Sequence, residues 1–204
     1  MIQEFFADYI SHGADQSPFL GAGTIRKLLV GGANHGMGEQ RSHGGVRKWR
    51  FDFPQRSEGY VTLLFFGYTW CPDQCPLHMA NLGGALKKMP AIADQVKLVF
   101  VTTDPARDSA AVVRRWLDLF DRHFIGRTGT ERAIEAVERA AGVPMAIKTG
   151  SANANYAVVH ANFVLAYSKD NFAHVIYPGG VSKDDWVHDL PLLIKETWTP
   201  RAQQ

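Results

Sequence analysis

The stretch that decides the fold is "YVTLLFFGYTWCPDQCPLHMANL", residues 60–82. It opens with a continuous apolar run, residues 60–68, which is typical of a strand buried on both faces of a parallel sheet. A helical pattern follows, with apolar residues on one stripe as far as Met89 and with Pro90 as its end. The sequence therefore predicts a strand, a turn and a helix, and both cysteines of the chain, Cys71 and Cys75, lie in the turn.

A proline follows each cysteine, and proline is best tolerated as the first residue of a helix. We therefore expect the helix to begin at Pro76, which places the turn at a helix N-terminus. Backbone amides there favour negative charge and lower the pKa of thiols. Two such sulfurs, with three residues between them, can bind a soft ion such as Cu(I) or Zn(II), or can close into a disulfide. The residues predict metal or redox chemistry and leave both open.

Two cysteines leave a metal ion under-coordinated, so a metal site needs a third ligand from elsewhere in the chain. His78 follows Cys75 by three residues, but one turn into a helix we expect it to point outward. His160 lies in the middle of a strand-like run, where we expect a strand to end or bulge, and this place could return it to the cysteine turn. Its spacing alone does not distinguish it from a structural histidine. The other histidines have no motif around them: His12, His35, His43, His123, His174 and His188. On spacing alone the third ligand stays open.

Further along the chain, apolar runs and capping residues predict the remaining elements. These are a buried strand at 96–104, a helix at 109–120 capped by Ser109, a helix from Thr130 to Gly142, a β-hairpin of residues 156–168 and 172–178 joined by "KDN", and a last helix capped by Ser182 and kinked by Pro191. The fold class that this order predicts is α/β, thioredoxin-like, with a central mixed sheet flanked by helices.

The first part of the chain differs from the rest. Nine of the nineteen glycines lie in the first 50 residues, and no helical or strand period appears there. We expect residues 1–58 to be an atypical, loosely ordered N-terminal segment and residues 59–199 to form the domain. The net charge of +2 is too small to indicate a nucleic-acid partner. The acidic start, broken by glycine and proline, shows no export signal, and no apolar run reaches the ~18 residues of a membrane anchor.

Four segments of the chain together resemble the Sco/SenC family of copper-binding, thioredoxin-like proteins over residues 60–198. They are "FGYTWCPDQCPLHMANL", "VTTDPARDSAAVVRRWLDLFD", "FIGRTGTERAIEAVERAAGV" and "YAVVHANFVLAY". The combination of "CPxxCP", "DPxRD" and a single histidine after "Y-x-V-x-H", in that order, is much more specific than any one motif.

The resemblance implies that Cys71, Cys75 and His160 bind one copper ion, Cu(I) or Cu(II), per chain. It implies a metallochaperone, not an enzyme, that delivers copper to the dinuclear copper site of cytochrome c oxidase during assembly. The alternative is a thiol–disulfide oxidoreductase whose Cys71–Cys75 pair reduces the cysteines of that site. The implied partners are the copper-site subunit or another copper protein, and a thiol reductant. The implied location is periplasmic, or membrane-anchored facing the periplasm.

The chain departs from the family pattern beside the histidine, where Val159 and Ala161 replace an acidic residue and a serine. We therefore expect different hydrogen bonds around the imidazole. The membrane anchor and the hairpin that usually precede the first strand are not visible in residues 1–58. In the "DPxRD" segment we expect Asp108 to cap the following helix, and Asp104 either orients a ligand or partner or is structural.

Three other readings of the cysteine pair are less favoured. A general reductase of thioredoxin type has two residues between its cysteines, whereas this chain has three. A peroxidase has threonine three positions before the reactive cysteine, where Tyr68 stands. An inert disulfide is an unusual use of a proline-braced pair at a helix start.

Overall fold

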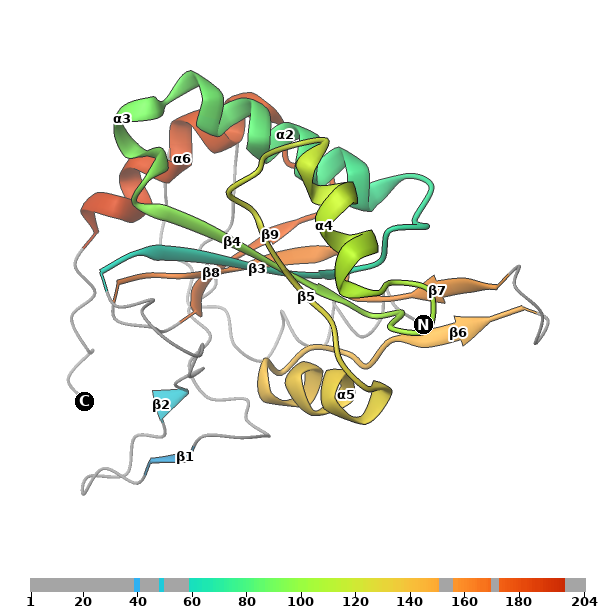
Figure 1. Cartoon of the computed structure of the whole chain (residues 1–204). Helices are drawn as coiled ribbons and strands as arrows, with labels where there is room; N and C mark the ends of the chain where they lie inside the picture. Colours follow the sequence, from blue (N-terminus) through green and yellow to red (C-terminus); the bar gives the residue numbers. More distant parts are fainter. Residues whose placement is uncertain (1–38, 41–47, 50–58, 151–155, 170–172, 197–204) are drawn as a thin grey trace.

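The computed structural model describes residues 39–40, 48–49, 59–150, 156–169 and 173–196. Its centre is a five-stranded sheet of order β5-β4-β3-β8-β9, in which β3, β4 and β5 are parallel and β8 and β9 are antiparallel to their neighbours (Figure 1). The strands are β3 (Val61–Gly67), β4 (Val96–Thr102), β5 (Ile125–Arg127), β8 (Phe163–Tyr167) and β9 (Ala173–Pro178). The predicted mixed sheet is confirmed.

Helices cover both faces of this sheet, as predicted (Figure 1). Three of them, α2, α4 and α6, pack on one face with the short α3, and α5 packs on the other. Their bounds are α2 (Gln74–Lys88), α3 (Pro90–Ala93), α4 (Ala110–Asp118), α5 (Glu131–Ala140) and α6 (Lys183–Lys195). No helix in the described ranges is both long and apolar enough to span a bilayer.

All seven residues of the central strand β3 are buried. Leu63 and Phe65 belong to the core beneath α2 and α6, whereas Leu64 and Phe66 belong to the core above α5. Because successive side chains of a strand point to opposite faces, a strand covered on both sides has no polar face. This explains the unbroken apolar run that begins the fold-deciding stretch.

The three predicted helix caps are confirmed. Ser109 Oγ accepts from the Val112 amide, Thr130 Oγ1 accepts from the Ala133 amide, and Ser182 forms a capping box with Asp185 at the start of α6.

One predicted detail about the helices is wrong. Helix α2 begins at Gln74, two residues before the predicted Pro76, because proline is also accommodated in the first turn, where an amide has no partner within the helix. Pro191 lies inside α6, and the expected kink there stays a prediction.

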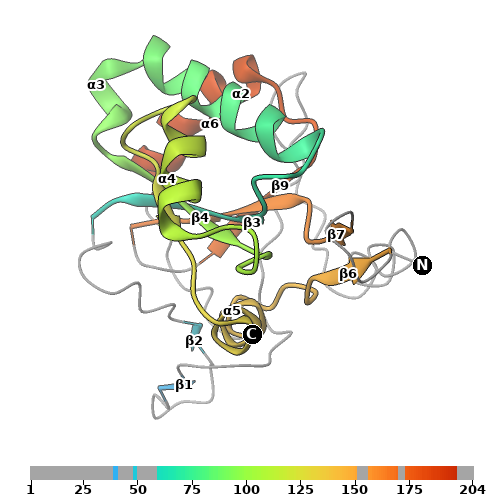
Figure 2. The same cartoon turned by 45° about the vertical axis from the view of Figure 1, so that its right-hand side comes forward.

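The predicted strand 156–168 is also wrong, because it is two strands. Ala157–Val159 is β7, which leaves the main sheet and pairs with β6 (Ile147–Thr149) in a separate ribbon that projects beside the sheet (Figure 2). His160 lies in the loop between β7 and β8. The short strands β5 and β6 are not predicted by the sequence. A strand therefore ends directly before His160, as expected, and the histidine lies in a loop.

Most of residues 1–58 lie outside the described residues, as do residues 197–199 and most of the "KDN" turn. The exceptions in the N-terminal segment are β1 (Glu39–Gln40) and β2 (Lys48–Trp49), which pair antiparallel with each other. The expected loose order of residues 1–58 and the domain bounds 59–199 stay predictions.

Candidate metal centre

Cys71 lies in the turn from β3 to α2, Cys75 lies in the first turn of α2, and two hydrogen bonds from backbone amides fix this segment. The Cys71 amide donates to the Tyr68 carbonyl at 3.2 Å, and the Cys75 amide donates to Cys71 Sγ at 3.5 Å. A Cβ atom on Gly67, the last residue of β3, would stand 2.8 Å from Cys75 Sγ. The glycine therefore lets the Cys75 sulfur approach the end of the central strand.

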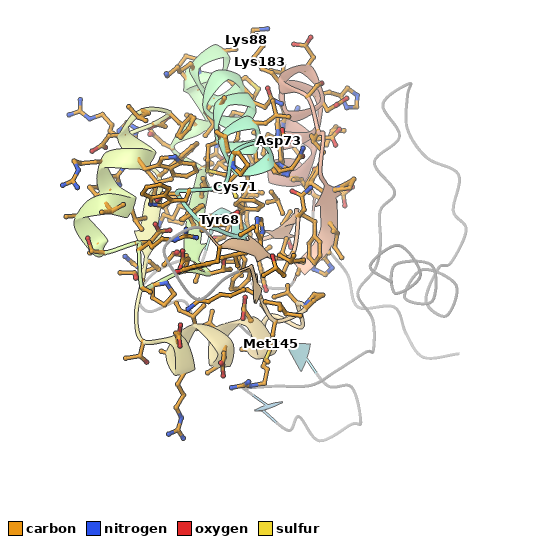
Figure 3. The ribbon with its side chains drawn as sticks, turned by 90° about the vertical axis from the view of Figure 1, so that its right-hand side faces the viewer. Tyr68, Cys71, Asp73, Lys88, Met145 and Lys183 are labelled. Atoms are coloured by element: carbon orange, nitrogen blue, oxygen red, sulfur yellow. The ribbon has the colours of Figure 1, made fainter. Side chains whose placement is uncertain are left out.

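His160 meets these cysteines from a distant part of the sequence. Its Nε2 atom lies 3.4 Å from Cys75 Sγ, across 85 residues of chain. The side-chain ligand atoms of Cys71, Cys75 and His160 all lie within 4.8 Å of one another. Figure 3 shows Cys71 and Tyr68 at the end of the sheet, beneath the start of α2. The structure thus brings together the three residues that the family resemblance implies.

The imidazole of His160 is held by its own loop and by two aromatic rings. Its Nδ1 atom lies 3.1 Å from the Ala161 carbonyl, and a proton on Nδ1 satisfies that carbonyl and leaves the Nε2 lone pair toward Cys75. The ring packs edge-on against Phe65 and Tyr68. A backbone carbonyl thus orients the imidazole in place of the missing acidic side chain.

The two sulfurs have opposite electrostatic environments. Burial raises the pKa of the Cys75 thiol, and the hydrogen bond with Cys71 raises it further. The hydrogen bond from Cys75 is also the largest cause that lowers the pKa of Cys71, to about 3, with a further contribution from His160. At neutral pH the half-exposed Cys71 is therefore a thiolate, while the buried Cys75 keeps its proton.

The prediction that Asp108 caps a helix is wrong, because Ser109 takes that role. Asp108 is fully buried, and its carboxylate accepts from the Thr69 amide at 2.9 Å, the Thr69 hydroxyl at 2.5 Å and the Thr102 hydroxyl at 2.7 Å. A buried carboxylate needs several donors, and these supply them. Asp108 therefore ties the cysteine turn to the end of β4.

Asp104 holds the strand that leads to His160. It is fully buried and accepts from the Tyr156 hydroxyl at 2.6 Å and from the Arg107 guanidinium. Arg107 stacks over the Tyr156 ring, 3.8 Å from its centroid, and donates to the Tyr156 carbonyl. Tyr156 directly precedes β7. The "DPxRD" segment therefore fixes the start of β7, the strand that ends directly before His160.

The prediction that His78 points outward is wrong. Its exposed fraction is 3%, its ring packs on Phe65, and burial lowers its pKa. Its Nε2 atom lies 3.2 Å from Asn162 Oδ1. The buried stripe of α2 runs through Cys75, His78 and Leu82 at helical spacing, so His78 faces the sheet. Asn162 was missed, although a lone amide in an otherwise apolar run, two residues after His160, is a readable signal.

Of the histidines without a motif, His123 and His188 are exposed beside Asp121 and Asp189. His12, His35 and His43 lie outside the described residues.

Comparison with known proteins places this geometry in a family. The family model described as SCO1/SenC matches residues 54–195. The mouse protein SCO2 homolog, mitochondrial, is 29% identical over 168 residues, 81% of this chain and 63% of that protein. The chain spans about half the length of other curated relatives that it matches.

Solved structures agree with this match. The crystal structure of Arabidopsis thaliana ScoI with copper bound has a TM-score of 0.61 and 29% identity, covering 68% of this chain and 86% of that one. BsSco, described as a member of the Sco family of cytochrome c oxidase assembly proteins, has a TM-score of 0.51 and 20% identity, covering 69% and 83%, and shares the fold. With the family model matching well over half of its residues, the chain belongs to the SCO1/SenC family.

Proposed function

We propose that this chain is a copper metallochaperone. It binds one copper ion, Cu(I) or Cu(II), through Cys71, Cys75 and His160, and delivers it to the dinuclear copper site of cytochrome c oxidase during assembly. The observation that carries the proposal is the convergence of three ligand atoms, from two segments far apart in sequence, within 4.8 Å. The copper-bound ScoI relative and the assembly role given for BsSco support it.

The donor set fits copper. Two sulfurs and an imidazole are soft or borderline ligands, which suit Cu(I) and tolerate Cu(II), and are poor ligands for Mg²⁺ or Ca²⁺. A trigonal ion with bonds of about 2.2 Å holds its ligands about 3.8 Å apart. The observed spacing needs shifts of roughly 1 Å to reach that geometry. Copper binding also removes the Cys75 proton, so that loading releases protons.

Delivery requires a bond that an incoming ligand can replace. Cys71 is half-exposed whereas Cys75 is buried, so that a partner's thiolate reaches the Cys71 side of the ion first. Exchange one bond at a time then passes the ion on without releasing it to water. The burial of Cys75 keeps the ion bound until the partner is in place.

Exposed apolar side chains beside the ligands suit a protein partner. Trp70, next to Cys71, has an exposed fraction of 65%, and Ile147, on β6, of 62%. Val159, next to His160, is exposed and pairs directly with Ile147 across the ribbon. Exposed apolar groups of this kind mark protein-binding surfaces. We propose that the recipient docks over Trp70, Ile147 and Val159.

Metal analysis of protein purified in reduced form tests copper binding. We expect one copper per chain and intense thiolate-to-copper absorption in the Cu(II) form. The Cys71→Ser/Cys75→Ser double variant should lose both. Copper retained at full stoichiometry by the double variant would refute the ligand set.

The alternative is a thiol–disulfide oxidoreductase, which the low pKa of Cys71 beside a protonated Cys75 favours. The Cys71 thiolate would attack a partner disulfide, forming a mixed disulfide and releasing one partner thiolate. Cys75 would lose its proton and attack Cys71 Sγ, releasing the second thiolate. The chain is left with a Cys71–Cys75 disulfide, and a thiol reductant then returns the pair to two thiols.

Turnover of an oxidised copper-site peptide, measured beside copper transfer to the same peptide when reduced, separates these functions. Copper transfer without disulfide reduction would leave the metallochaperone function and exclude the oxidoreductase. Both activities belong on the periplasmic side of a membrane, and we propose that location for this chain.

A further inference from the structure

Asn162 joins the two segments that carry the metal ligands. It lies in the loop between β7 and β8, two residues after His160. Both the oxygen and the nitrogen of its side-chain amide contact the beginning of α2. Oδ1 lies 3.2 Å from His78 Nε2, and Nδ2 donates to Gln74 Oε1 at 3.4 Å. With its proton on Nε2, His78 donates to the amide oxygen.

The two contacts on α2 lie on either side of a ligand. Gln74 and His78 are four residues apart, and residues at this spacing share one face of a helix. Cys75 follows Gln74 in the same turn. The amide of Asn162 therefore spans the helical turn that presents Cys75, and attaches the His160 loop to it.

The surroundings of this amide are shaped to hold it. His78 is buried against the Phe65 ring, so its imidazole is fixed. A Cβ atom on Gly179 would lie 2.4 Å from Asn162 Nδ2, so the glycine leaves space for the amide. We call Gln74, His78 and Asn162, with the space left by Gly179, the Asn162 clamp.

We propose that Asn162 is a positioning residue for the metal centre: the clamp sets the distance between His160 Nε2 and Cys75 Sγ. The His160 ring is hydrogen-bonded to the carbonyl of Ala161 in the same loop, so the imidazole moves with the loop that Asn162 anchors. The inference rests on the proposed function in that the clamp matters when His160 binds copper. Residues that orient metal ligands through hydrogen bonds typically change metal affinity about 10–100-fold when removed.

The first test measures copper. Asn162→Leu removes both hydrogen bonds and keeps the same branched arrangement of heavy atoms. We expect about tenfold weaker copper binding in a competition titration, and a changed nitrogen hyperfine pattern from His160 in the Cu(II) form. Asn81→Leu is the matched control, because Asn81 is also half-buried and donates to the Val181 carbonyl from α2. The control should lose stability but keep the wild-type copper affinity and spectrum.

The second test needs no metal. When the clamp is broken, the His160 loop no longer covers Cys75, so alkylation of Cys75 by iodoacetamide in the reduced, metal-free protein should become several-fold faster. Gly179→Ala should have the same effect by pushing a methyl group into Asn162, while Gly129→Ala, with an ordinary 3.5 Å contact, should not. The glycine variant leaves every hydrogen-bonding residue of the clamp in place.

The outcomes separate the clamp from the copper function. If Asn162→Leu and Gly179→Ala leave the alkylation rate, the copper affinity and the spectrum at wild-type values, the clamp is overturned, even if His160→Ala still weakens binding. If both variants speed alkylation while the wild-type protein binds no copper, the clamp stands and the metallochaperone falls.

Discussion

The Nε2 atom of His160 lies 3.4 Å from the sulfur of Cys75, although 85 residues separate them in the chain. Cys75 is fixed by the packing of α2 on β3, and His160 by a loop between two strands that belong to different sheets. The metal centre therefore depends on tertiary structure, and variants far from the ligands should affect it in distinguishable ways.

Replacing His160 by alanine removes one of three proposed ligands. We expect copper affinity to fall at least tenfold while the two sulfurs still bind the ion weakly. Competition titration with a Cu(I) chelator measures the change. His123→Ala is the control, because His123 is an exposed histidine paired with Asp121. Equal affinities for wild type and His160→Ala would remove the histidine from the site.

The two cysteines should differ in reactivity. Because the pKa of Cys71 is lowered to about 3, its thiolate fraction hardly changes between about pH 5 and about pH 8, and alkylation of Cys71 should be fast and nearly independent of pH. Cys75, buried and protonated, should react slowly throughout. Mass spectrometry of the reduced, metal-free protein locates the label. In urea the two rates should converge, and faster labelling of Cys75 in the folded protein would contradict the assignment.

Asp108→Ala should destabilise the metal-free fold by about 3 kcal/mol, because it leaves the buried donors of Thr69 and Thr102 without their acceptor. Urea denaturation measures the free energy of unfolding. Asp118→Ala, which removes an exposed ion pair with Arg114, should cost about 0.5 kcal/mol. Similar costs for the two variants would show that Asp108 is not an anchor.

Stability should depend on pH through His78. Burial lowers its pKa in the folded chain below the ordinary value of 6.5, so that below pH 6.5 the unfolded chain binds a proton that the folded chain does not. The free energy of unfolding of the metal-free protein should therefore fall as the pH drops below 6.5, and should keep the His78 contribution in full above it. His78→Gln should flatten this dependence. A variant with the wild-type slope would assign the effect to other groups.

Trp70→Ala should leave copper affinity unchanged and slow the transfer of copper to a partner protein, because the indole is exposed beside Cys71. Stopped-flow absorption follows loss of the thiolate-to-copper band. Leu119→Ala, another exposed apolar residue, at the end of α4, is the control. Equal transfer rates for the three proteins would place the docking surface elsewhere.

Local signals in the sequence were enough for the central strands, three helix caps and the cysteine turn. Strand β3 and the caps depend on neighbouring residues, so their patterns are readable. A strand end or bulge at His160 could be expected, but the separate pairing of β7 with β6 could not, because it is decided by tertiary structure. Strands of three residues, such as β5, are too short to show a period.

The site divides in the same way. The spacing of Cys71 and Cys75 and the prolines beside them predict metal or redox chemistry, whereas the role of His160 as a ligand was predicted from the family resemblance. Asn162 itself can be noticed as a lone amide in an apolar run, but the partners of Asp108 and Asn162 lie 39 and 84 residues away, so the sequence does not reveal these contacts. His78 was misread because the side of α2 that packs on the sheet, which includes Cys75, His78 and Leu82, is set by tertiary packing.

The loop histidine also has a consequence for biogenesis. During synthesis the two sulfurs emerge from the ribosome long before the imidazole, and β8, which brings it back, must insert beside β3 as an antiparallel neighbour. Pairings of such long range form late, after slow loop closure. A nascent or misfolded chain can therefore offer copper only two sulfurs. Full copper affinity is reached only when the chain has folded completely.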